Sequence, residues 1–127
     1  MNIGDVFHLA VHEKHLDTGV HEYMVWFAAD CEVIPLPEIV PWVQVSVECD
    51  LPPFVHEPHH STRGHTMLNS ALEQIREGAT LALLHRRHGL RMAIRELKIH
   101  PVDFNPYRFF HHTYYYVRKQ LEALDEK

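Results

Sequence analysis

The chain has 127 residues and a formal charge of −5 when its 13 histidines are neutral. Apolar residues make up 46% and charged residues 23%, as in an ordinary globular protein, and no apolar run approaches a membrane span of about 18 residues. The acidic balance counts against a general nucleic-acid binder, because neutralising phosphates needs a net basic face. The length predicts one domain, residues 1–127, around one hydrophobic core.

The two cysteines, Cys31 and Cys49, are too few to predict a disulfide framework. The N-terminal segment also lacks the basic start of a signal peptide. Together these features predict free thiols and a cytoplasmic location. A link between the two cysteines stays open, because both fall near predicted strand ends.

Alternating apolar residues predict strands in the first half of the chain. We expect strands at 5–12 and 21–29 that form a hairpin, and a third strand at 42–49. The density of prolines across 30–41 predicts a loop there, with at most a short edge segment at Val33–Ile34. Residues 50–64 are expected to form a long loop, and loops of this length in compact domains are usually functional or mobile.

The longest segment with a single helical period runs from His65 to Arg87. Its apolar residues recur at three- and four-residue steps, which predicts an amphipathic helix. Gly78 inside this helix would let another backbone approach closely, and Gly89 is placed to end the helix in a left-handed cap. The predicted buried stripe is Leu68, Ala71, Leu72, Ile75, Ala79, Ala82 and Leu83.

Residues 90–99 predict a fourth strand, although a continued helix is the alternative. The apolar residues occupy even positions in the first half of this strand and odd positions in the second half. A bulge near Arg95–Glu96 would place both sets on the same face of the sheet. Asn105 followed by Pro106 is a strong helix start, and this last helix is expected to reach about Leu124. Its predicted stripe is Phe110, Thr113, Val117, Leu121 and Leu124.

The predicted order is therefore β-β-β-α-β-α. A helix between the third and fourth strands makes those strands parallel if they share a sheet. The expected fold class is α+β: a two-layer sandwich, with a largely antiparallel sheet of about four strands and two helices on one face.

Histidine is the compositional peculiarity of the chain, and imidazole is the commonest metal ligand. The loop before the long helix can bring several ligands onto one ion, such as zinc or another divalent transition metal. The spacing matches no strong motif, however, which favours a polar surface rich in histidine over a metal site. His85 and His88, three residues apart, are expected on one helix face. The candidate metal ligands are His56, Glu57, His59, His60 and His65.

Two other groups of residues suggest contacts with partners. Basic residues cluster in 86–98 and form either a solvated face or an anion-binding patch: Arg86, Arg87, Arg91, Arg95 and Lys98. Tyr114, Tyr115 and Tyr116 cover three sides of the last helix, so at least one must face outward, where it would serve a homodimer or a protein partner. Neither cysteine has a catalytic motif around it, which favours structural thiols over a nucleophile.

The pattern of residues 65–124 resembles domain IV of translational GTPases such as elongation factor G. The corresponding parts are the helix from Ala71 to Leu84, the strand from Leu90 to Ile99 and the helix that contains Phe109 and Phe110. The resemblance implies the ribosomal protein S5 domain 2-like fold, whose crossover can be left-handed. The chain has no P-loop and its charge is acidic, so the resemblance carries over the fold and no functional residue.

These observations predict a small cytoplasmic domain that binds a ligand or partner, with a candidate site in the loop from His56 to His65. One alternative is a metal-dependent, hydrolase-like enzyme that uses Glu57 as general base. Another is a ribosome- or RNA-associated domain that uses the basic cluster. Whether the protein is an enzyme, and with which catalytic residues, stays open on sequence grounds.

Overall fold

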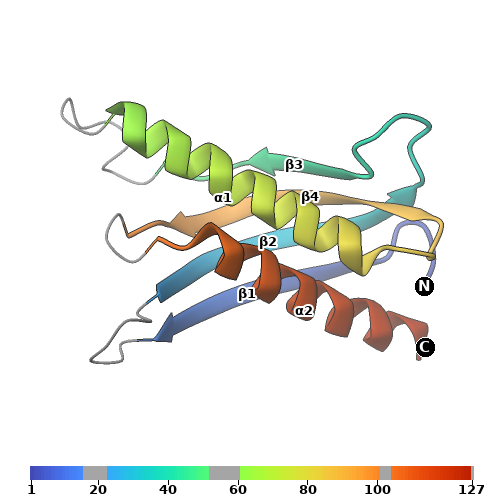
Figure 1. Cartoon of the computed structure of the whole chain (residues 1–127). Helices are drawn as coiled ribbons and strands as arrows, with labels where there is room; N and C mark the ends of the chain where they lie inside the picture. Colours follow the sequence, from blue (N-terminus) through green and yellow to red (C-terminus); the bar gives the residue numbers. More distant parts are fainter. Residues whose placement is uncertain (16–22, 52–60, 101–103, 127) are drawn as a thin grey trace.

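The computed structural model describes residues 1–15, 23–51, 61–100 and 104–126. Neither helix among these residues carries an apolar stretch long enough to cross a bilayer. The elements follow one another in the order β-β-β-α-β-α (Figure 1). They are β1 (Val6–His15), β2 (Tyr23–Pro35), β3 (Val43–Val47), α1 (Ser61–Ala82), β4 (His88–Lys98) and α2 (Pro106–Asp125).

The four strands form one sheet in the order β1-β2-β4-β3. The β1–β2 and β2–β4 pairs are antiparallel, and β3 pairs with β4 in parallel. Both helices lie side by side on one face of this sheet (Figure 1). The predicted α+β sandwich, the first hairpin and the parallel third and fourth strands are therefore confirmed.

The β3–α1–β4 crossover has an uncommon hand. In Figure 1, β3 runs from right to left, α1 returns in front of the sheet, and β4 runs from right to left below β3. This path is left-handed, whereas almost all crossovers between parallel strands of one sheet are right-handed. Neither helix of the described residues covers the opposite face of the sheet.

The core lies between the sheet and the two helices. The predicted stripe of α1 is buried except for Leu72, which is half-buried. In α2, the predicted Thr113, Val117, Leu121 and Leu124 are buried, but Phe109 takes the position assigned to Phe110. Phe109 is fully buried and stacks on Phe27 of β2, whereas Phe110 is only half-buried beside α1.

The predicted loop at 30–41 is wrong in its first half, because β2 continues to Pro35. This part of β2 pairs on both sides, with Glu32 opposite Val6 of β1 and Pro35 opposite His88 of β4. Cys31 and Val33 point into the core, so burial and pairing on both edges outweigh the turn preference of the prolines. Pro35 is tolerated because it ends the strand.

The predicted end of the long helix is also wrong. The helix stops at Ala82, and His85 and Arg87 take left-handed backbone angles in the turn that follows. Gly89 lies within β4 and does not cap the helix. A Cβ atom at Gly89 would lie 2.8 Å from the Trp42 carbonyl oxygen, so this glycine lets the segment before β3 pack against β4.

Two finer predictions are confirmed. The β2–β4 register shifts between Ala28 and Ala29, and Arg95 is the extra residue that forms the bulge. Gly78 brings the two helices together, since a Cβ atom there would lie 2.6 Å from the Phe110 carbonyl oxygen.

Candidate functional site

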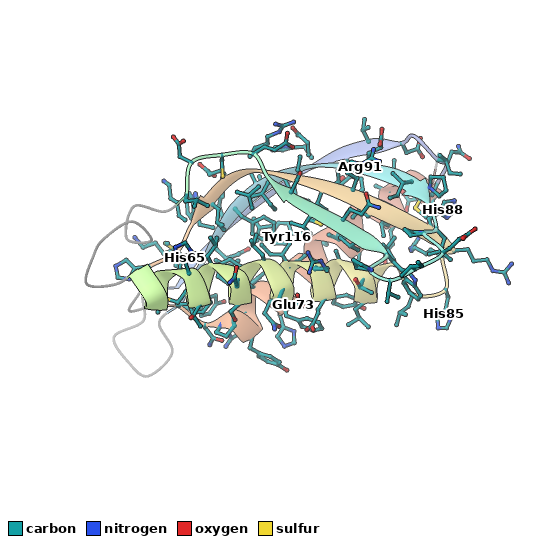
Figure 2. The ribbon with its side chains drawn as sticks, turned by 90° about the horizontal axis from the view of Figure 1, so that it is seen from above. His65, Glu73, His85, His88, Arg91 and Tyr116 are labelled. Carbon is teal, nitrogen blue, oxygen red and sulfur yellow. The ribbon has the colours of Figure 1, made fainter. Side chains whose placement is uncertain are left out.

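The predicted histidine site falls largely outside the described residues. His56, Glu57, His59 and His60 lie in 52–60, and His65 is an exposed residue near the start of α1. Figure 2 shows His65 at one end of the molecule, with His85 and His88 at the other. Within 1–15, 23–51, 61–100 and 104–126, no three histidine, cysteine, aspartate or glutamate side chains gather around a point that could hold a metal ion.

The prediction that His85 and His88 share a helix face is wrong. Because α1 ends at Ala82, His85 sits in the turn and His88 opens β4. The His88 Nδ1 lies 2.7 Å from the carbonyl oxygen of Arg86, which fixes the ring against the turn. These two histidines thus belong to the connection between α1 and β4.

The uncovered face of the sheet carries two histidine–carboxylate pairs. His8 Nδ1 lies 2.9 Å from Asp30, and His12 Nε2 lies 2.8 Å from Glu96. The bulge at Arg95 turns two consecutive charged residues of β4 toward this face. The His12 ring also stacks on Trp26 at a centroid distance of 4.1 Å.

Three of the four arginines of the basic cluster are paired with acids. Arg95 donates to Asp30 at 2.9 Å and lies 3.6 Å from Glu48. Arg91, which Figure 2 shows on the sheet, donates to Glu32 at 2.6 Å. Arg86 donates to Asp125, so three of the five predicted basic residues have a carboxylate partner. These acids would repel a phosphate that approached the arginines.

These ion pairs border a shallow depression of about 640 Å³ on the uncovered face of the sheet. Hydrogen bonds from His8 and Arg95 hold the pKa of Asp30 below its usual range. The charges nonetheless alternate across the strands, and exposed ion pairs of this kind contribute little to stability. The carboxylates and arginines that line the depression are largely paired with one another rather than free to bind a ligand.

Both cysteines are free, as predicted. Burial raises the pKa of the Cys31 thiol to about 12, and the neighbouring Asp30 acts in the same direction. Burial, Asp50 and Glu96 also raise the pKa of Cys49. Raised values disfavour the thiolate that nucleophilic catalysis needs, which supports structural roles for both residues.

The three consecutive tyrosines of α2 have different surroundings. Tyr116, labelled in Figure 2, donates a hydrogen bond to Glu13 of β1 at 2.5 Å and ties the helix to the sheet edge. Tyr114 is half-buried and accepts from Arg118 at 3.2 Å. Tyr115 is 46% exposed, so it is the tyrosine of the three that faces outward.

Sequence reasoning missed an apolar surface over the second half of α1. Val40 is 72% exposed, and Leu81 near the end of α1 and Leu84 just beyond that helix are exposed beside it. A depression of about 490 Å³ lies on this surface, and we call it the α1 groove. Its lining residues are Val40, Pro41, Trp42, Glu73, Arg76, Glu77, Thr80, Leu81, Leu84 and Phe110.

Two sequence features could have indicated the α1 groove. The segment between β2 and β3 places Leu36, Ile39 and Val40 among its prolines, although such loops are normally polar. Leu81 of α1 and Leu84 just beyond its end lie outside the buried stripe and extend its apolar surface toward solvent. Neither feature shows from sequence alone that the loop and the helix meet.

No protein-family model matches the sequence, and a search of curated proteins finds no match either. The resemblance of residues 65–124 to domain IV of translational GTPases therefore stays a prediction.

Proposed function

We propose that this chain is a small binding domain and that the α1 groove receives its partner. The observation that carries the proposal is the clustering of exposed large apolar side chains on one surface. Val40, Leu81 and Leu84 come together there. Large apolar patches on soluble domains commonly mark interaction sites, because leaving them in water is unfavourable.

The shape and polarity of the α1 groove favour a peptide-like partner. Val40 and Trp42 come from the segment before β3, Leu81 from α1 and Phe110 from α2. An amphipathic helix that places apolar residues three and four positions apart would bury side chains against such a surface.

The charges beside the groove favour a basic partner. Glu73 and Glu77 lie on the exposed side of α1, and Arg76 pairs with Glu73 at 3.0 Å. Glu77 has no ion pair with another described residue, so it is available to a cation on the partner. Charge complementarity of this kind guides association and orientation more than it adds affinity.

A defined probe tests the proposal. A synthetic helical peptide, with leucines at every third and fourth position and lysines between them, is titrated into isotope-labelled protein and followed by NMR. Resonance shifts are expected at 36–42, the second half of α1 and Phe110. The Leu81→Ser/Leu84→Ser variant should bind at least about tenfold more weakly, because it loses apolar contact area.

Ile3→Ser is the matched control, since Ile3 is 61% exposed and does not line the groove. This variant should bind like the unchanged chain. Shifts centred on the open sheet face, or equal weakening by both variants, would contradict the proposal.

A metal site at His56–His65 remains a second proposal that rests on the sequence, together with its hydrolase-like form in which Glu57 is the general base. Binding of RNA by the basic cluster is less favoured, because Arg86, Arg91 and Arg95 already face carboxylates.

A further inference from the structure

We propose that the partner of the α1 groove is a second copy of this chain, which presents an exposed stripe on α2. This inference rests on the proposed function and names the occupant of that same site. The α2 stripe consists of Tyr107, His111, Tyr115 and Lys119.

The stripe has the spacing of one helix face. Its members are four residues apart and all are exposed, so they form a continuous row along α2. The Tyr107 ring meets His111 edge-on at a centroid distance of 4.3 Å, and the Lys119 ammonium lies 4.7 Å from the centre of the Tyr115 ring. The row is therefore aromatic, carries a cation at its end and contains no acid.

The α1 groove and the α2 stripe adjoin each other. Phe110 lines the groove, and its ring lies 6.5 Å from Tyr107 and 5.7 Å from His111. The two helices run side by side in the same direction on the helical layer (Figure 1). A two-fold axis through this layer would place each stripe on the groove of the other copy, so both contacts form at once and the assembly closes as a dimer.

The charges of the two surfaces are complementary. The groove carries Glu77, and the stripe carries Lys119, which has no carboxylate partner among the described residues. In a two-fold dimer, Glu77 of each copy would lie opposite Lys119 of the other, so the same ion pair would form twice. The apolar residues of the groove would meanwhile cover the exposed faces of Tyr107 and Tyr115, which are 63% and 46% exposed in the single chain.

Sedimentation velocity over a wide concentration range tests the dimer. We expect the unchanged chain to shift from monomer to dimer as its concentration rises. Glu77→Lys and Lys119→Glu should each weaken association at least about tenfold, because each places like charges opposite one another twice. The double variant Glu77→Lys/Lys119→Glu should recover most of the association, since it restores both pairs with reversed signs.

Matched controls separate this interface from others. Glu126→Lys changes an exposed acid beyond the end of α2, and Ile3→Asp changes an exposed apolar residue that belongs to neither the groove nor the stripe; both should leave association unchanged. Tyr115→Ser should weaken it. A chain that stays monomeric at every concentration, or a double variant no better than the single ones, would overturn the dimer.

The same measurements distinguish the dimer from the proposed function. A monomeric chain that still binds the leucine–lysine peptide at the α1 groove would overturn the second copy as the occupant and leave the binding function in place. A chain that neither dimerises nor binds the peptide would overturn both.

Discussion

Gly78 of α1 lies directly against the backbone of Phe110 in α2. A Cβ atom at position 78 would lie 2.6 Å from the Phe110 carbonyl oxygen and 3.0 Å from the Thr113 Cβ. The two helices can therefore pack at this distance only because Gly78 has no side chain. Their separation also sets how Phe110 is presented between the α1 groove and the α2 stripe.

Gly78→Ala should destabilise the protein, although alanine is the better helix former by about 1 kcal/mol. The added methyl group meets backbone that cannot rotate away, and such overpacking costs about 1–3 kcal/mol. Urea unfolding measures the change in free energy. Asn69→Ala, at an exposed position of the same helix, is the control and should not destabilise; if Gly78→Ala raised the stability, the close approach of the helices would be incorrect.

Tyr116 should ionise at a higher pH than an ordinary tyrosine. The hydrogen bond to Glu13, aided by burial, raises the pKa of Tyr116 to about 12. The folded state therefore favours the neutral phenol, and the stabilising contribution is complete below about pH 10 and lost as the pH rises toward 12. Absorbance titration at alkaline pH should show a late component that belongs to Tyr116.

The late component should disappear in Tyr116→Phe and move to lower pH in Glu13→Gln, because the carboxylate that opposes ionisation is removed. Tyr107→Phe is the control and should retain it. A late component that survives Tyr116→Phe would assign it to another residue.

Cys49 should react with alkylating reagents before Cys31 does. Cys31 is 3% exposed and its pKa is about 12, so both access and thiolate formation are suppressed. Cys49 is half-buried, although its pKa is also raised. Mass spectrometry of a timed iodoacetamide reaction at neutral pH gives the order, and labelling of both sites at equal rates would show that Cys31 is not held in the core.

Metal binding by the histidine loop is tested by elemental analysis of the untagged protein. One zinc or similar ion per chain, lost in His59→Ala/His60→Ala, is expected if that loop and Glu57 supply ligands. His85→Ala/His88→Ala is the control, because these residues lie at the other end of α1 (Figure 2). Absence of metal from the unchanged chain, or its persistence in the loop variant, would reject the site.

The sequence alone determined most of the architecture. The stripe of α1 and the Asn105–Pro106 start of α2 follow from local periodicity and capping, which depend on residues only a few positions apart. The bulge at Arg95 was predictable for the same reason, because the apolar residues of β4 shift there from even to odd positions.

Element ends were decided by tertiary contacts. Prolines predicted a loop at 30–41, but pairing with both β1 and β4 extends β2 to Pro35. Gly89 matched a helix cap, but its role is to admit the backbone of Trp42 beside β4. Local preferences contribute only fractions of a kilocalorie to a few kilocalories per mole, and burial of neighbouring side chains outweighs them.

The α1 groove depended on tertiary structure entirely. Val40 lies more than forty residues from Leu84 in the chain, and Phe110 belongs to the other helix. Only the crossover from β3 through α1 to β4 brings the segment before β3 beside the end of α1. A surface assembled from such distant segments has no period or spacing in the sequence, whereas the core stripes do, because each helix carries its own share of the core.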